Sequence, residues 1–334
     1  MNQAGKWYKT IGIVAAIGAV LTACGTSNGT SGGTPQQTAQ TGKAATGAGI
    51  ENKEAAAPKT RMFEDWKKRQ VEIPADPKRI VFSGETYGDL LALGVNAVGT
   101  YLQPLKGTIL ESRVNQVADI GFPINLEKTL ELKPDLIIIA TSDEKTVDAL
   151  NKIAPTVTFD TFATIEQRMT TLGQMLGKQQ EAAKWLDAYK LKSDAMWKKL
   201  RDAGMKQDET ASVFTYYPGN KLYVMAGAGL PQFLYQQNGF KPMDKTRELI
   251  SQNKGFSLIS QEVLQEYAGD RIFILTPATE EARKSTDDLM KTRIWNELPA
   301  VKNGHVYVIP IERSSSDATT REWMIDELPK LLAK

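Results

Sequence analysis

One stretch of this sequence occurs twice, and this duplication constrains the fold more than any other feature. The first copy runs from Asn125 to Ile139 and the second from Ser260 to Ile274. Each copy opens with a helix N-cap residue, carries a carboxylate in the first turn and ends in an apolar strand of buried type. The identical pairs share one offset: Glu127 and Glu262, Glu131 and Glu266, Asp135 and Asp270, Ile137 and Ile272, Ile139 and Ile274. We interpret the repeat as the sign of two similar lobes, with chance matching as the alternative.

Strands of buried type alternate with helices over short loops on both sides of the chain's middle. Such alternation predicts an α/β fold with two Rossmann-like lobes, each built on a parallel-rich sheet. Residues 165–204 carry no strand pattern, and we expect one long rigid helix there, from Lys178 to about Arg201. The expected parts are an N-terminal lobe (60–177), a connecting helix (178–204) and a C-terminal lobe (205–334). Within the C-terminal lobe, residues 241–259 read as an irregular loop.

The connecting helix carries an apolar stripe. Trp185, Tyr189, Met196 and Leu200 recur at helical spacings, which is typical of a face packed against a core. Ligand platforms formed by Trp185 and Trp197 are the alternative interpretation.

The N-terminus has the pattern of an export signal. Lys6 and Lys9 precede the apolar run Ile11–Leu21, which is too short to span a bilayer. The following Leu21-Thr22-Ala23-Cys24 resembles a bacterial lipobox, in which Cys24 becomes the lipidated first residue. We expect a signal peptide (1–23), a flexible lipidated tether (24–59) and anchoring at the extracytoplasmic face of the cell membrane. A chance cysteine after an ordinary signal peptide is the alternative.

The composition offers little catalytic chemistry. The chain has one His and one Cys, and its 41 Lys+Arg against 39 Asp+Glu leave a net charge of +2. This balance gives no reason to expect nucleic-acid binding, and His305, in a turn before a strand, reads as structural. We predict no enzyme, no metal site and no resident cofactor. A glycosidase using Glu127 and Glu131 stays as the alternative to solvated first-turn acids, and Gly227-Ala228-Gly229 reads as a turn rather than a phosphate loop.

Ligands of parallel α/β lobes bind beyond the carboxyl ends of the strands. Tyrosines, amides, hydroxyls and a few cations in those loops suit a bulky polar ligand with apolar walls. The candidate contacts are Tyr87, Tyr101, Gln103, Lys106, Ser142 and Asp143 in the first lobe, and Tyr216, Tyr217, Lys254, Thr276, Arg313 and Ser314 in the second.

Asn125–Ile137 and Ile294–Tyr307, with the lipobox and the helical connector, resemble the ferric-siderophore-binding lipoproteins of ABC importers, which have the helical-backbone class III binding-protein fold. The resemblance covers about residues 60–334. It implies that Glu127 and Glu262 dock on arginines of a membrane permease that works with its ATPase. It also implies a ferric siderophore as ligand and a monomeric protein.

The subclass of ligand follows from the same resemblance. Thr215 and Tyr217 stand where catecholate-binding relatives place arginines, which leaves Lys106, Lys254 and Arg313 as cations. This pattern indicates a less charged hydroxamate or citrate-hydroxamate siderophore, and Leu258–Ala268 resembles the Gram-positive hydroxamate binders. Ferric citrate, a catecholate, haem and cobalamin are alternative ligands. A surface-tethered enzyme on the same two-lobed scaffold is the alternative of another class.

Overall fold

The structure is a computed structural model that describes residues 59–333. The predicted signal peptide, the lipidation site Cys24 and the tether up to residue 58 lie outside the described residues.

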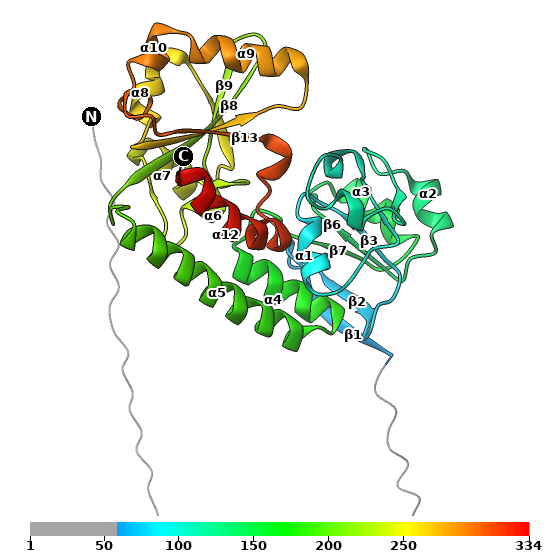
Figure 1. The fold of residues 1–334 in the computed structure, drawn as a ribbon. Helices are drawn as coiled ribbons and strands as arrows, with labels where there is room; N and C mark the ends of the chain where they lie inside the picture. The colour runs from blue at the N-terminus through cyan, green and yellow to red at the C-terminus, as the bar shows by residue number, and fades with distance from the viewer. Residues whose placement is uncertain (1–58, 334) are drawn as a thin grey trace, which may run out of the picture. The chain divides into compact units, whose positions relative to one another are not determined.

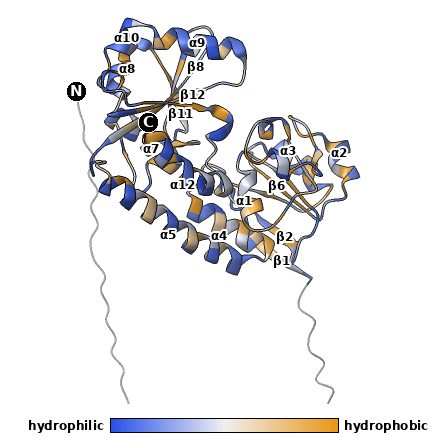
Figure 2. Cartoon of the chain, viewed as in Figure 1, coloured by the Kyte–Doolittle hydropathy of each residue, from blue (hydrophilic) through white to orange (hydrophobic). Residues whose placement is uncertain are grey.

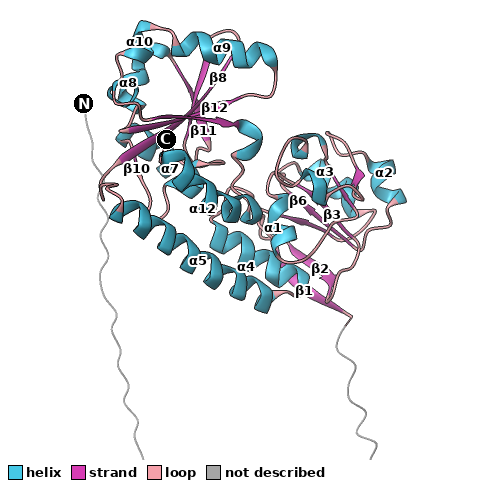
Figure 3. Ribbon diagram, viewed as in Figure 1, coloured by secondary structure: helices cyan, strands magenta, loops and turns pink. Residues whose placement is uncertain are grey.

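The first lobe is built on a five-stranded sheet in which every pairing is parallel, in the order β5-β4-β3-β6-β7. An antiparallel hairpin of β1 and β2 precedes it. Between α1 and α2 the lobe is mostly loop and short 3-10 turns (Figure 3). Its elements are β1 (Thr60–Glu64), β2 (Gln70–Pro74), β3 (Ile80–Ser83), α1 (Tyr87–Ala92), β4 (Gly99–Thr100), η1 (Gln103–Leu105), η2 (Glu111–Arg113), β5 (Ala118–Asp119), α2 (Leu126–Glu131), β6 (Leu136–Ile139), α3 (Glu144–Asn151) and β7 (Thr156–Thr158).

The second lobe has a mixed sheet in the order β11-β9-β8-β12-β13, with β10 paired to β8. Strands β8, β12 and β13 are parallel, whereas β8, β9 and β11 form an antiparallel meander. Its elements are β8 (Thr210–Tyr217), β9 (Lys221–Met225), α6 (Pro231–Leu234), β10 (Lys241–Pro242), α7 (Asp244–Ser251), β11 (Phe256–Ile259), η3 (Gln261–Val263), α8 (Leu264–Tyr267), β12 (Arg271–Thr276), α9 (Glu280–Met290), α10 (Arg293–Asn296), α11 (Pro299–Lys302), β13 (Val306–Pro310), η4 (Ile311–Arg313) and α12 (Ala318–Leu332).

The prediction of an irregular loop at 241–259 is wrong. It contains helix α7 and strand β11, which adds an edge strand to the meander. The strand escaped detection because Phe256 and Leu258 are exposed, so its outer face is as apolar as its inner one and lacks the alternation that marks a half-buried strand.

Two helices, α4 (Ile165–Leu176) and α5 (Gln179–Asp202), join the lobes (Figure 1). Thr164 and Gln167 form a capping box at the start of α4, and Gly177 ends it in the left-handed conformation. Helix α5 confirms the predicted long connector, and Tyr189 and Met196 of its stripe are buried. Trp185 is half-buried and stacks on Tyr189.

Both copies of the repeat place an aspartate at the same structural position. Asp135 accepts hydrogen bonds from the backbone N–H groups of Lys78 and Arg79 at 2.7 and 2.9 Å, just before β3. Asp270 accepts from the N–H and the hydroxyl of Thr210 at 2.9 and 2.7 Å, at the start of β8. Each carboxylate therefore ties the strand that follows it to the start of its parallel neighbour.

The repeat's helix caps differ from one copy to the other. Asn125 caps α2 as predicted, accepting the N–H of Lys128 at 2.9 Å. Ser260 stands at the N-cap position of η3 but accepts no N–H of that turn. A hydrogen bond with the Ser260 side chain instead lowers the pKa of Glu262. Ser260 thus occupies the predicted N-cap position, but without the side-chain hydrogen bond that Asn125 makes.

The strands form the apolar interior, while the visible face of α9 is largely hydrophilic (Figure 2). One core cluster runs from Phe82 in the first lobe through Trp197 of α5 to Phe273 in the second. Separate clusters fill the outer layers of each lobe. Because the largest cluster is continuous from the first lobe to the second, helices α4, α5 and α12 are part of the apolar core that the two lobes share. The predicted fold class is confirmed.

We expect Asp135→Ala to lower the free energy of unfolding by about 1–3 kcal/mol, because two N–H groups at the start of β3 lose their acceptor. Urea unfolding followed by circular dichroism measures this loss. Asp148→Ala, at an exposed position of α3, is the matched control and should unfold like the wild type. Equal stability of the two variants would contradict the role of the repeated aspartate.

Candidate ligand-binding site

The carboxyl ends of β3, β6 and β7 surround a hollow of about 260 Å³ in the first lobe. This is the edge of the sheet at which the sequence predicted ligand contacts. Its lining residues are Trp66, Glu85, Ala140, Thr141, Ser142, Phe159, Asp160, Thr161 and Phe162. Of the predicted contacts, Ser142 lines this hollow. The lining has two carboxylates and no lysine or arginine, so the hollow does not suit a polyanion.

Trp66 reaches this hollow because a buried carboxylate anchors the loop of the β1–β2 hairpin. Asp65 accepts hydrogen bonds from the N–H groups of Lys67 and Arg69, both at 3.0 Å. It also accepts the N–H and hydroxyl of Thr158 on β7, at 3.0 and 2.8 Å, and the Arg69 guanidinium. The Trp66 N–H donates to the Thr158 carbonyl at 3.3 Å. Trp66 was not predicted as a site residue, because nothing in the local sequence indicates that its loop folds against β7.

Hydrogen bonds stabilise the ionised form of the Asp65 carboxylate. Burial acts to raise its pKa, but the hydrogen bonds from Thr158 and Arg69 outweigh burial, so the pKa of Asp65 lies below its usual value. The hairpin loop is therefore held by an ionised group at neutral pH.

A strip of aromatic rings lies on one face of the β8–β9–β11 meander in the second lobe. Tyr217 packs edge-on against Tyr223 at 6.1 Å between ring centroids, and Tyr223 packs in the same way against Phe256 at 5.9 Å. Phe256 is 54% exposed, so the strip is open to solvent at its end. Tyr217 was predicted as a ligand contact, whereas Tyr223 and Phe256 were missed because the strand β11 itself was missed.

Two close approaches bring the predicted loops of the two lobes together. A Cβ at Gly255 would lie 3.3 Å from the ring of Phe162, so the loop with Lys254 lies beside the first-lobe hollow. A Cβ at Gly107 would lie 3.6 Å from Cγ of Glu312, so the loop of Gln103 and Lys106 lies beside the loop of Arg313 and Ser314. Gln103, Lys106, Lys254 and Arg313 are all exposed, as a contact with a soluble ligand requires.

Six other predicted contacts have partners within the protein. Tyr87 is fully buried in the first-lobe core, where its hydroxyl bonds to the Asn96 side chain and accepts the Ala97 N–H at 3.0 Å. Burial raises the pKa of Tyr87 to about 12. We therefore correct its assignment from ligand contact to core residue. Tyr216 is also buried, bonding Asn220 and Gln261, so it too is corrected to the core. Ser314 donates to the Ile311 carbonyl at 2.7 Å.

Thr276 and Tyr101 are half-buried. Thr276 donates to the Ile309 carbonyl at 3.4 Å, and Tyr101 stacks on Phe122 with ring centroids 5.6 Å apart. Asp143 caps α3 by accepting the Thr146 N–H. A hydrogen bond from the Thr146 hydroxyl lowers the pKa of Asp143. These contacts account for each side chain without a ligand.

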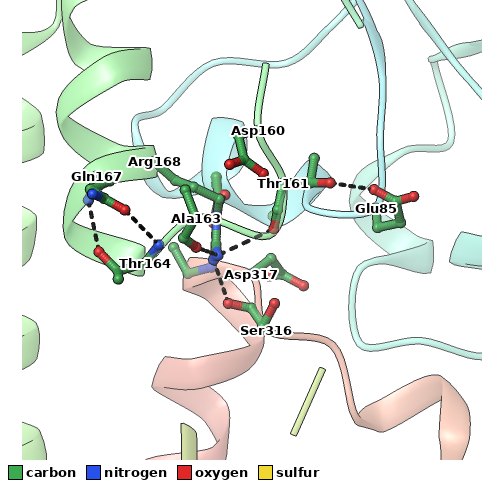
Figure 4. A network of polar contacts seen from close by, with 12 residues as sticks. Glu85, Asp160, Thr161, Ala163, Thr164, Gln167, Arg168, Ser316 and Asp317 are labelled. Carbon is green, nitrogen blue, oxygen red and sulfur yellow. Dashed lines mark hydrogen bonds and ion pairs between the residues drawn. The ribbon is translucent and has the colours of Figure 1, made fainter. Parts of the chain in front are cut away.

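A buried polar network joins the lobes next to the hollow (Figure 4). The guanidinium of Arg168, on α4, donates to Asp89 on α1 at 2.8 Å and to the Ser316 carbonyl at 2.7 Å. It also donates to the Ala163 carbonyl at 2.7 Å and to Gln232 on the second lobe at 3.0 Å. One side chain therefore binds segments of both lobes and the connector.

Helix α12 returns from the second lobe to complete this network. Its first N–H, from Ala318, donates to the second oxygen of Asp89 at 2.7 Å. Asp317 caps the same helix and occupies the space where a side chain at position 88 would lie, since a Cβ on Gly88 would be 1.8 Å from its Oδ1. Burial and the Asp89 carboxylate raise the pKa of Asp317. Arg321 donates to the Ser316 carbonyl at 2.8 Å and to Gln232 at 3.1 Å.

The repeated acids Glu127 and Glu262 are exposed, and neither lines the hollow. Glu127 lies in the first turn of α2, beside the exposed Leu126 and Leu130. Glu262 lies in η3, directly after the strand with the exposed Leu258. Each lobe thus presents one acid next to apolar side chains.

Within residues 59–333, no cluster of three or more His, Cys, Asp or Glu side chains is arranged to hold a metal ion. Over the same described part of the chain, none of the helices combines the length and apolar character needed to cross a membrane.

The family model described as periplasmic binding protein matches residues 80–312, which include both sheets and the connector. The chain belongs to this family. Its members are solute-binding proteins and not enzymes. The iron(3+)-hydroxamate-binding proteins YxeB and FhuD of Bacillus subtilis are 32% and 33% identical to it, over 81% and 79% of this chain and 84% of each relative.

Solved structures agree with this assignment. Staphylococcus aureus SirA complexed with staphyloferrin B superposes with a TM-score of 0.72 at 27% identity, over 82% of this chain and 99% of that chain. Staphylococcus aureus FhuD2 with bound ferrioxamine B superposes with a TM-score of 0.68 at 29% identity, over 77% of this chain and 98% of that chain.

We expect Asp65→Asn to lower the free energy of unfolding at pH 7 by about 2–3 kcal/mol, because charge-assisted hydrogen bonds are lost. The wild-type pKa is depressed, so this stabilisation is present above the usual carboxyl pKa of about 3.9 and is lost as the pH falls through the lower folded value. Urea unfolding between pH 7 and pH 3 should therefore show the two proteins converging at low pH. Asp208→Asn, at an exposed position, is the control. A pH-independent difference would contradict the ionised anchor.

Proposed function

We propose that this protein is the substrate-binding lipoprotein of an ABC importer. It captures a ferric siderophore, of hydroxamate or citrate-hydroxamate type, and delivers it to a membrane permease for iron uptake. Anchoring through Cys24 at the extracytoplasmic face of the cell membrane is part of this proposal. Iron here is cargo inside the chelate, and the protein supplies walls and hydrogen bonds rather than iron ligands.

The observation that carries the proposal is that each lobe presents a different surface, a hollow at the strand ends of the first lobe and an aromatic strip on the meander of the second. The first-lobe hollow offers Trp66 and Phe162 with hydroxyls and two carboxylates, and the aromatic strip of Tyr217, Tyr223 and Phe256 lies on the second lobe. Exposed Lys254 belongs to the loop that packs on Phe162, between the two. Apolar walls with a few polar groups are typical of small-molecule sites.

Charge decides between the siderophore classes. Three monoanionic hydroxamates neutralise ferric iron, whereas three catecholate dianions leave a trianion. A trianion beside Glu85 and Asp160, which line the hollow, would be repelled by these two carboxylates. A neutral or cationic hydroxamate complex meets no such penalty, and a citrate-hydroxamate complex, with its smaller negative charge, is repelled less than a trianion. The relatives whose names state hydroxamate binding support the same choice.

The exposed acids supply the delivery surface of this proposal. Glu127 and Glu262 come from equivalent positions of the repeat, so a permease with two-fold symmetry would meet two like charges on the two lobes. Exposed carboxylates next to apolar side chains can pair with arginines while excluding water at the contact.

The ligand class is tested by tryptophan fluorescence on the mature chain. Ferrioxamine B should quench the emission saturably, because Trp66 lines the hollow, whereas the iron-free chelator should not. Ferric citrate and a ferric tris-catecholate are the competitors, and we expect the catecholate to compete at least about tenfold more weakly, a difference of roughly 1.4 kcal/mol. Absence of quenching by every ferric chelate would overturn the proposed function. Preferred binding of the catecholate would overturn the subclass alone.

Delivery is tested by Glu127→Ala and Glu262→Ala in cells that take up the ferric chelate. Each variant should bind the chelate like the wild type but lower uptake by about tenfold, because the acid no longer pairs with the permease. The matched controls are Glu131→Ala and Glu266→Ala, which remove the other repeated acids, both of them exposed. Loss of chelate binding in Glu127→Ala would move that residue into the ligand site, and equal uptake by all four variants would exclude the docking role.

A further inference from the structure

Helix α2, the helix of the first repeat copy, turns its apolar side chains to solvent. It buries Thr129 completely and leaves Leu126 and Leu130 42% and 58% exposed. The Thr129 hydroxyl donates to the Asn125 carbonyl at 2.7 Å, so this buried polar group is satisfied. A helix on the surface of a protein ordinarily turns its apolar side chains to the core. The pattern of α2 is therefore inverted.

The second copy of the repeat is an internal reference for this pattern. A leucine, Leu264, stands at the position equivalent to Thr129 and is likewise fully buried. Glutamines, Gln261 and Gln265, stand at the positions equivalent to the two exposed leucines of α2. The second copy thus has the ordinary arrangement, with an apolar side chain inside and polar ones at the positions of those leucines. The fold of the repeat does not require leucines at these two positions of α2.

The exposed leucines and the repeated acid share one surface of α2. Leu126 and Leu130 are four residues apart, and Glu127 and Leu130 are three apart, spacings that make side chains neighbours on a helix. Glu127 is exposed as well. We call Leu126, Glu127 and Leu130 the leucine face. Phe122, in the turn that leads into α2, is 77% exposed and adds apolar surface before the helix.

The acid within the leucine face indicates what can cover it. A carboxylate removed from water is costly unless a cation or hydrogen-bond donors pair with it. A second copy of this chain across a two-fold axis would bring two Glu127 carboxylates together, and the hydrocarbon of a lipid surface would offer Glu127 no partner. The chain's own segment from Cys24 to Pro58 has Ile50 as its single large apolar side chain, too little to cover two leucines. The occupant that fits is an apolar surface of another protein that carries a cation.

We propose that the leucine face is an apolar anchor for docking on the permease. This inference rests on the proposed function and deepens it: Leu126 and Leu130 enter an apolar groove of the permease, and Glu127 pairs with a cation at the rim of that groove. Apolar burial adds affinity to the ion pair and excludes water from it. The helix of the second copy, with its two glutamines, has no such anchor, so the two lobes contribute unequally to docking.

The test gives α2 the residues of the second copy. The double variant Leu126→Gln/Leu130→Gln should lower cellular uptake of radiolabelled iron from ferrioxamine B by about tenfold, because two leucines no longer leave water on docking. Its fluorescence titration with ferrioxamine B and its melting temperature should match the wild type, because both side chains are exposed. Leu126→Met/Leu130→Met keeps the surface apolar and should retain uptake. Leu191→Gln, at a 73% exposed position of α5, is the matched control and should also retain it.

The other occupants are tested on the mature chain with Cys24→Ser, which carries no lipid. This chain is mixed with vesicles of phosphatidylglycerol and phosphatidylethanolamine, and its self-association is measured by sedimentation velocity. We expect neither vesicle binding nor self-association. Either one, if abolished by the double glutamine variant, would assign the leucine face to lipid or to a second copy and overturn the proposal.

Two further outcomes would also overturn the anchor while the proposed function stands. One is uptake at the wild-type rate by the double glutamine variant, and the other is loss of ferrioxamine B binding in that variant. Failure of the proposed function looks different, because the wild type itself would then neither bind a ferric chelate nor support its uptake, and the anchor would be overturned with it.

Discussion

The Asp89 carboxylate is the group on which the arrangement of the two lobes depends. It lies on α1 of the first lobe, is fully buried, and accepts from Arg168 of the connector and from the first N–H of α12. A buried charge is costly unless it is paired and hydrogen-bonded. Each partner of Asp89 comes from a different part of the chain, so the charge is satisfied only when first lobe, connector and α12 are assembled together. The network therefore specifies one arrangement of the three.

This constraint explains why the ligand surfaces lie where they do. Arg168 also binds the Ala163 carbonyl and Gln232, and Gln232 donates to the Phe162 and Gly227 carbonyls at 3.2 and 2.8 Å. The same bonds thus position Phe162 at the first-lobe hollow and the Gly227 turn of the second lobe beside it. Groups held by rigid neighbours bind with less loss of conformational entropy, so the junction preorganises the site that we assign to the siderophore.

Sequence reasoning worked best where local pattern and tertiary contact agree. The apolar strands of the repeat, the long α5 helix and the Asn125 cap all follow from local signals, and the structure contains them. The prediction of site residues identified loops better than side chains. Tyr87 and Tyr216 come from the right strand ends but are buried in cores, and the direction of Tyr216 depends on a partner, Gln261, that is distant in sequence. Trp66 and Phe256 were missed because only tertiary packing brings their segments to the site.

The return of α12 has a consequence for the order of assembly. The Ala318 N–H that donates to the Asp89 carboxylate belongs to α12, which follows the strand β13 in the sequence. During synthesis from the N-terminus, all strands of both sheets emerge before this group does. Each lobe can form its own sheet early, but the Asp89 carboxylate lacks one of its partners until α12 has been made. Helix α12 thus locks together two lobes whose sheets are already complete, and a chain truncated before it would carry both sheets without this shared contact.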